Sequence, residues 1–324
     1  MSAGGIPHDA VVVGGGPAGL AAATWLARYR RDVVVVDAGE QRSRGVEWSH
    51  GYLGRDPQRP MDLVDRAVEQ LLGYPTAIRV GAEVLAARRD GERFVLGLDD
   101  GRELSALRVV LATGVVDAFP DVEGFAEHYG ASAFHCPACD GYDAQDRAVV
   151  AYGWDERLVG FATSLLNWAR SVTVLTSGHR FAGDDVCLDV LARHDVEVVE
   201  TPARRMLGSR GSLDGVELAD GRVVPAQLLF FSVDHEPRTG LARQLGCRVG
   251  EEGYVEIDAD GRTSVEGVYA AGDVVPGLQL VQVAAAQGTA AGIAAARSLH
   301  GSPGSPLSPS PAPDAPREVD AARP

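Results

Sequence analysis

The sequence of 324 residues contains no lysine, so all 30 of its basic residues are arginine. Without lysine the chain has no residue for Schiff-base catalysis or for the phosphate contact of a P-loop. Acidic residues outnumber the arginines, 45 to 30, so the formal net charge is −15. This balance argues against nucleic acid or an anionic membrane as a partner.

Long apolar runs are also missing. No stretch approaches the ~20 apolar residues that a membrane-spanning helix needs, and the first nine residues lack the charged start and apolar segment of a secretory signal. We therefore expect a cytoplasmic protein without a membrane anchor. The length is sufficient for two domains, each with its own core.

Cysteine is rare, and four cysteines in a chain of this size exclude a disulfide scaffold. Cys187 and Cys247 stand alone, and we expect both to be small buried hydrophobic residues. Cys136 and Cys139 instead form a Cys-x-x-Cys pair. In a reducing compartment such a pair is more often catalytic or metal-binding than structural.

A glycine loop lies near the start of the chain, with Gly14, Gly16 and Gly19 between an apolar strand and a helix ending near residue 30. The first glycine permits a tight turn, the second a close approach of a pyrophosphate, and the third close packing of helix on strand. A second strand, 33–37, ends in Asp37, whose carboxylate is suited to ribose hydroxyls. This βαβ pattern predicts a dinucleotide site.

The rest of the chain repeats this organisation. A second strand–helix–strand unit is predicted at 148–152, 156–169 and 172–176, and a further strand and helix at 268–273 and 279–299. Asp-Gly pairs predict the turns of two antiparallel meanders. These pairs are 90–91, 100–101, 214–215 and 220–221.

The predicted fold class is therefore α/β, with two Rossmann-like dinucleotide-binding domains, each a parallel sheet with a small antiparallel meander. The first domain is expected to be discontinuous, comprising residues 1–116 and 240–300, with the second domain, 117–239, inserted between them. Residues 301–324 are rich in serine and proline, and we expect this tail to be disordered.

Three interpretations of the Cys136–Cys139 pair remain open. A zinc site requires two further ligands, and the sequence contains no second Cys-x-x-Cys or His-x-His, so no metal site is predicted. A structural disulfide is the second interpretation. A redox dithiol is favoured, because this spacing permits a readily reduced bond and a lowered thiol pKa. Asp140 is suited to exchange a proton with the leaving thiolate, and His135 to tune the thiols, although both are alternatively solvated polar residues.

Gly272 and Asp273 end a predicted strand before the last helix. A carboxylate here is suited to bind the ribityl chain of a flavin. The N-terminus of the helix beyond it is suited to stabilise negative charge at the N1/O2 edge of the reduced flavin ring. The alternative is that Asp273 caps the helix.

Four motifs together resemble the low-molecular-weight thioredoxin reductases over residues 8–300. They are Gly-Gly-Gly-Pro-Ala-Gly at 14–19, Ala-Thr-Gly at 112–114, Cys-Pro-Ala-Cys-Asp-Gly at 136–141 and Ala-Gly-Asp at 271–273. The resemblance implies a homodimer that binds FAD. The implied FAD-binding residues are Gly14, Gly16, Pro17, Ala18, Gly19, Asp37, Gly114, Gly272 and Asp273.

The resemblance also implies that Cys136 and Cys139 form a redox-active disulfide. In this arrangement Cys139 lies nearer the flavin, Cys136 meets the substrate, and Asp140 is the acid.

The second strand–helix–strand unit departs from the reductases. Of the glycine loop that would hold NADPH only Gly153 is present, and Tyr152 and Trp154 would crowd a pyrophosphate. Glu156 would repel phosphate. The reductases' His-Arg-Arg is replaced by Thr-Ser-Gly at 176–178, leaving only Arg180 nearby, and their Arg-Gln by Gln-Leu at 279–280. These departures weigh against NADPH.

These departures are similar to those of the dithiol oxidases, which close disulfides in natural products such as holomycin and gliotoxin. The segment 50–54 and the helix from residue 279 also resemble the oxidases more than the reductases. The sequence thus predicts oxidation of a small-molecule or peptide dithiol through FAD, with oxygen as the acceptor. Asp140 keeps the reductase form of the motif, so an NADPH-dependent reductase of a thioredoxin-like protein is the alternative. A redox-silent binding protein is the third possibility.

Overall fold

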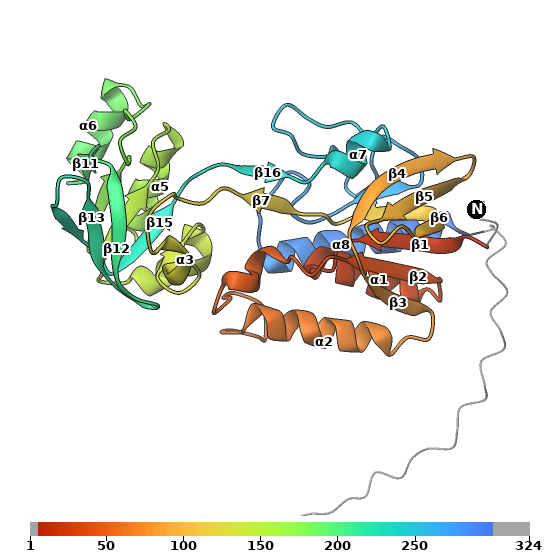
Figure 1. Ribbon diagram of the computed structural model, residues 1–324. Coiled ribbons are helices and arrows are strands. Elements are labelled where there is room, and N and C mark those ends of the chain that lie inside the picture. The colour runs from red at the N-terminus through yellow and green to blue at the C-terminus, as the bar shows by residue number, and fades with distance from the viewer. Residues whose placement is uncertain (1–5, 301–324) are drawn as a thin grey trace, which may run out of the picture.

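The computed structural model describes residues 6–300. They form two α/β lobes joined by an extended two-stranded ribbon (Figure 1). The predicted fold class is confirmed, since each lobe contains a parallel sheet and an antiparallel meander. In the described part of the chain no helix is long and apolar enough to span a membrane.

The first lobe is built on one mixed sheet of order β3-β2-β1-β6-β5-β4, with β17 also paired to β6. Strand β6 joins the two parts of this sheet, because its first half pairs antiparallel with β5 and its second half parallel with β1. The strands are β1 (His8–Val13), β2 (Val33–Asp37), β3 (Ala77–Gly81), β4 (Val84–Asp90), β5 (Arg93–Leu98), β6 (Glu103–Leu111) and β17 (Val268–Ala270).

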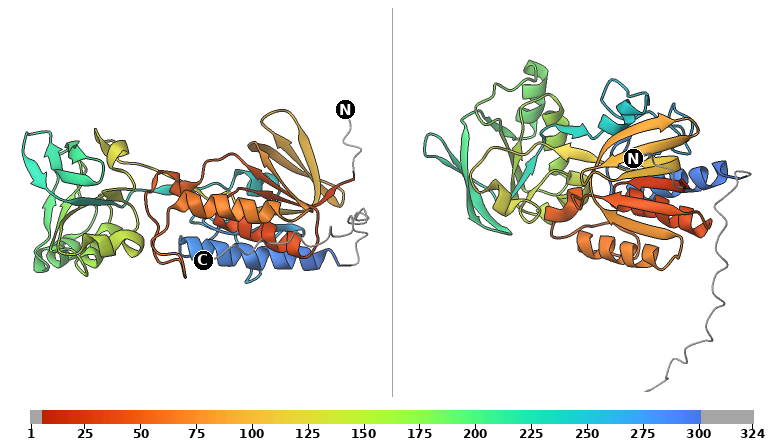
Figure 2. Two further views of the ribbon diagram at one scale, coloured as in Figure 1. Left: turned by 90° about the horizontal axis from the view of Figure 1, so that it is seen from below. Right: turned by 45° about the vertical axis from the view of Figure 1, so that its right-hand side comes forward.

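Helices cover both faces of this sheet, which explains why β1 and β2 are continuous runs of buried valine and alanine. Helices α1 (Pro17–Arg28), α2 (Pro60–Leu72) and α8 (Val281–Ser298) pack on one face (Figure 2). The short helix α7 (Gly240–Gln244) packs on the other.

Two glycines let α8 lie directly against α1. A Cβ atom on Gly288 would stand 2.0 Å from the carbonyl oxygen of Ala18, and one on Gly292 2.4 Å from that of Ala22. The two backbones are therefore as close as main-chain atoms allow. This contact fixes the start of α1, which carries the glycine loop.

The second lobe contains a parallel sheet of order β11-β10-β9-β15-β8. Helices α5 (Arg157–Leu165) and α6 (Asp185–Arg193) contribute to the core on one face, and a three-stranded antiparallel sheet packs on the other. The parallel strands are β8 (Ala133–Phe134), β9 (Ala148–Tyr152), β10 (Ser171–Leu175), β11 (Glu197–Val199) and β15 (Leu228–Phe231). The antiparallel strands are β12 (Ala203–Ser209), β13 (Ser212–Leu218) and β14 (Val223–Pro225).

Two local predictions are wrong. The turn predicted at 214–215 lies inside β13, and the chain turns at 210–211 instead. Gly215 serves close packing there, because a Cβ atom would stand 2.6 Å from the carbonyl oxygen of Val224 on the neighbouring strand. Cys247 is buried as predicted, whereas Cys187 is half-buried at the first turn of α6.

The ribbon between the lobes consists of β7 (Val115–Asp117) paired antiparallel with β16 (His235–Pro237). The domain boundaries drawn after residues 116 and 239 fall in or beside this ribbon, and they remain predictions. The tail predicted at 301–324 lies outside the described residues.

Replacement of Gly288 by alanine should force α1 and α8 apart, because the new methyl group would overlap main-chain atoms that have no room to move. We expect Gly288→Ala to lower the free energy of unfolding by about 1–3 kcal/mol. Gly160→Ala in α5 is the matched control, since no atom lies within 4 Å of its added Cβ. The control should be neutral or more stable. Equal urea midpoints for the two variants would contradict the packing argument.

Candidate active site

A cavity of about 670 Å³ lies where the first lobe meets the Cys-x-x-Cys segment of the second. Almost all the site residues predicted from the sequence line this cavity. Those lining it are Gly14, Gly16, Pro17, Ala18, Asp37, Gly114, Cys136, Cys139, Asp140, Gly272 and Asp273. Gly19 is the exception, and its place is structural: a Cβ atom there would stand 1.9 Å from the carbonyl oxygen of Gly14.

The glycine loop has the form of a phosphate cradle. Gly14 has a φ of +109°, and a Cβ atom on it would stand 2.2 Å from the carbonyl oxygen of Ala112. Gly16 caps α1 without any side-chain hydrogen bond, and no atom lies within 4 Å of its added Cβ. The N–H groups of the first turn of α1 are therefore left for a ligand. An open helix N-terminus of this kind suits the pyrophosphate of a dinucleotide such as FAD.

Asp37 ends β2 at the cavity wall and is only 5% exposed. Its carboxylate accepts from Arg79 at 2.6 Å, from the Gly39 amide at 3.0 Å and from Gln41 at 3.0 Å. Arg79, which the motif search did not single out, neutralises a charge that would be costly to bury alone. Binding of ribose by Asp37 remains a prediction.

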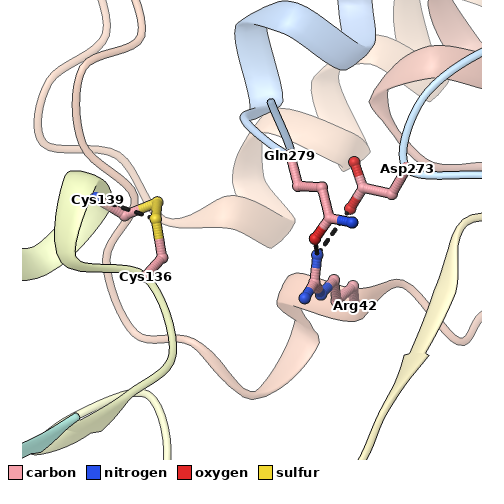
Figure 3. The surroundings of a disulfide bond; sticks show 5 residues. All are labelled: Arg42, Cys136, Cys139, Asp273 and Gln279. Carbon is pink, nitrogen blue, oxygen red and sulfur yellow. Dashed lines mark hydrogen bonds and ion pairs between the residues drawn. A yellow bond between two sulfur atoms is a disulfide. The ribbon is translucent and has the colours of Figure 1, made fainter. Parts of the chain in front are cut away.

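Asp273 accepts a hydrogen bond from Nη1 of Arg42 at 3.0 Å (Figure 3). The alternative role, capping of the last helix, is wrong. The N-cap position of α8 is Leu280, and no side chain caps it. Binding of the ribityl chain by Asp273 remains a prediction.

Arg42 is the centre of an ion-pair network that the sequence analysis missed. It lies in a short 3₁₀ helix, η1 (Arg42–Gly45), and pairs with both oxygens of Asp117 at 2.7 and 2.5 Å. Its Nη1 also donates to Gln279 at 2.6 Å. One guanidinium thus joins η1, the ribbon strand β7, the segment after β17 and the segment that leads into α8.

Cys136 and Cys139 form a disulfide at the start of the short helix α4 (Pro137–Asp140). The amide of Cys139 donates to Sγ of Cys136 at 3.1 Å. Both sulfur-bearing residues line the same cavity as Arg42, Asp273 and Gln279 (Figure 3). The structure therefore brings the disulfide to the open side of the glycine cradle.

Asp140 is 7% exposed, and burial raises its pKa to about 7. At neutral pH it is therefore poised to give or take a proton beside the disulfide. His135 directly precedes Cys136 in the chain, and burial together with the charge of Arg42 lowers its pKa to about 4. It is therefore a neutral imidazole at physiological pH.

The turn after β9, at the predicted place of a second dinucleotide, carries a stacked aromatic pair and acidic side chains. The ring of Trp154 stacks on that of His179 with centroids 4.0 Å apart, and the carbonyl of Trp154 accepts from the Ala182 amide at 2.8 Å. Arg157, at the start of α5, pairs with Asp155 and Asp234. Arg180 is exposed.

A glycine cradle that faces a disulfide across one cavity defines a flavin-dependent disulfide oxidoreductase. Over residues 8–288 the chain matches the family described as pyridine nucleotide-disulphide oxidoreductase, and it belongs to that family. It is 31% identical over 308 residues to thioredoxin reductase tcpT of Claviceps purpurea, covering 90% of this chain and 94% of the relative.

Solved structures agree with this assignment. The structure of HlmI is 36% identical and has a TM-score of 0.86, covering 93% of this chain and 94% of the other. Putative thioredoxin reductase TrxB from Bacillus anthracis is 29% identical with a TM-score of 0.84, covering 90% and 98%. The resemblance drawn from the motifs is confirmed: the protein is an enzyme of thioredoxin reductase type, and its family implies a bound flavin.

Removal of the Arg42 guanidinium would leave two largely buried carboxylates, Asp117 and Asp273, without their shared partner. We expect Arg42→Ala to destabilise the protein by about 3–5 kcal/mol. Arg88→Ala removes an exposed pair with Glu103 and should change stability little. Urea denaturation of both variants tests this. An unchanged midpoint for Arg42→Ala would show that the network carries no stability.

Asp140 should make the wild-type protein lose stability as pH rises from about 4 to 7. The native state keeps this proton up to a pKa of about 7, whereas an unfolded aspartate releases it near pH 4. Asp140→Asn removes that loss, so the stability of the variant relative to wild type should increase with pH. Asp65→Asn, at an exposed position, controls for the lost charge. A pH-independent difference between Asp140→Asn and wild type would contradict the raised pKa.

Proposed function

We propose that the protein is an FAD-dependent dithiol oxidase, which converts a dithiol in a small molecule or peptide into a disulfide. The observation that carries this proposal is the Trp154–His179 stack in the second lobe. Trp154 stands in the turn after β9, where a second dinucleotide would place its pyrophosphate, and His179 in the turn after β10 holds its ring, whereas the equivalent turn in the first lobe is open.

The charges around this second turn point the same way. Glu156 precedes α5, and Arg157 is already engaged by two carboxylates. Glu156 and the two carboxylates that hold Arg157 therefore place negative charge around this turn, which disfavours a phosphate. Electrons from NADPH have no well-formed entry here, so a dithiol substrate is the donor that fits.

The residues of the chain have separate tasks in this reaction. The glycine cradle and Asp273 hold FAD, which when bound accepts an electron pair and passes it to an acceptor such as dioxygen. Cys136 receives a thiolate of the substrate, the bond between the two sulfurs breaks, and Cys139 leaves as a thiolate. Asp140 holds or releases the accompanying proton because its pKa lies close to 7.

The second candidate is an NADPH-dependent reductase of a thioredoxin-like protein. It is favoured by Asp140, which keeps the reductase form of the redox motif, and by relatives named thioredoxin reductase. In that case electrons flow from nicotinamide to the disulfide and on to a partner protein. A homodimer is expected in either case.

Anaerobic stopped-flow mixing of the yellow holoenzyme separates the two candidates. We expect dithiothreitol to bleach the flavin band rapidly. NADPH or NADH at the same concentration should bleach it at least about 100-fold more slowly, because Trp154 and acidic side chains stand at the turn after β9. Rapid bleaching by a nicotinamide would overturn the oxidase proposal in favour of the reductase.

Cys139→Ser controls for direct reaction between thiols and flavin. The variant should retain FAD, because residue 139 belongs to the second lobe and not to the cradle, but it should lose dithiol-dependent bleaching. Full activity of this variant would show that the disulfide takes no part.

A further inference from the structure

A histidine–carboxylate pair opens onto the same cavity and has no place in the reaction as described so far. Nδ1 of His50 lies 3.0 Å from Oδ1 of Asp56, and His50 lines the cavity with Cys136, Cys139 and Asp140. A carboxylate on Nδ1 fixes the tautomer of an imidazole, so that Nε2 is the nitrogen that accepts a proton. The pair thus places a candidate base in the cavity that also contains the disulfide.

The loop that carries His50 is held at several points. Ser49 pairs with Gln58 as a β-bridge, and the Gly51 amide donates to Asp56 at 3.1 Å. The carbonyl of Gly51 accepts from Gln282 at the start of α8 at 3.3 Å. His50 is therefore anchored both to its own loop and to the helix that borders the cavity.

We propose that His50, oriented by Asp56, is the general base that takes the proton from the substrate thiol as it attacks the Cys136–Cys139 disulfide. This proposal rests on the proposed function. It assigns the deprotonation step to a residue of the first lobe, whose ring faces Asp143 and Asp140 of the second lobe.

The step balances as follows. The substrate S–H gives its proton to Nε2 of His50, the sulfur bonds to Sγ of Cys136, and Cys139 leaves with the electron pair as a thiolate. The second substrate thiol then gives its proton to Asp140 and attacks the same substrate sulfur. Cys136 leaves as a thiolate and takes the proton from His50. The substrate is oxidised by two electrons and the protein disulfide is reduced by two.

The surrounding charges favour a base at this position. Three acidic side chains face the ring: Asp56 on its own loop, Asp143 with Oδ2 3.6 Å from Nε2, and Asp140 on α4. The His50 side chain is 30% exposed and accessible to a substrate, whereas Asp140 is almost completely buried.

The test follows the rate of anaerobic flavin bleaching by dithiothreitol against pH in wild type, His50→Gln and Asp56→Asn. At pH 7 the rate in His50→Gln should fall about 30-fold, because only about 3% of a thiol with a pKa of about 8.5 is ionised there. The difference should shrink towards none at about pH 9.5, because a thiol with a pKa of about 8.5 is then already ionised. Asp56→Asn should show the same trend with a smaller loss.

His8→Gln is the matched control. His8 also holds a carboxylate on Nδ1, that of Asp32 at 2.8 Å, but it starts β1 and does not line the cavity. This variant should bleach at the wild-type rate at every pH. Retention of the flavin band and thermal unfolding confirm that each variant is folded.

Each outcome has one meaning. Equal rates for His50→Gln and wild type at all pH values overturn the role of His50 and leave the proposed function intact. A loss by the same factor at every pH overturns it as well, because it indicates a disturbed structure. An equal loss in His8→Gln shows that the effect is not specific and also overturns it. Failure of wild type to be bleached by dithiothreitol overturns the proposed function and this inference together.

Discussion

The ion pairs of Arg42 are the constraint on which the geometry of the site depends. This one guanidinium neutralises Asp117 on the ribbon and Asp273 at the carboxyl edge of the first sheet. Asp117 lies where the chain leaves the first lobe, so the pair fixes the direction in which the second lobe begins. The disulfide lies beyond that point, and its position opposite the glycine cradle follows from it.

Most of the fold was predictable from the sequence, because periodicity and glycine spacing are local signals. The loop at Gly14 and the buried run of β2 defined the first βαβ unit correctly. The turn predicted at Gly215 was wrong, since an Asp-Gly pair predicts a turn even where the glycine is needed for contact with a neighbouring strand. That contact, with Val224, is tertiary and leaves no mark in the local sequence.

The candidate site also contains residues that the sequence predicted and residues that it did not. Cys136, Cys139 and Asp140 were found because their spacing carries chemical meaning by itself. Arg42 and the orientation of His50 were not, because both lie in irregular segments whose pairing no sequence period describes: His50 is oriented by Asp56 within its own loop. Arg42 meets Asp273 across 231 residues. A charge in an irregular loop acquires its role only from the three-dimensional neighbours that it pairs with.

The segment that carries His50 is also where the lobes touch. The Glu47 amide donates to the carbonyl of Gly130 at 2.9 Å, and His50 faces Asp143 of the second lobe. A rotation about the ribbon that swings the sulfurs outward would therefore withdraw the base from them in the same movement. On the proposed role of His50, a disulfide exposed in this way would meet surrounding thiols without a base to deprotonate them, so bystander thiols would reduce it slowly.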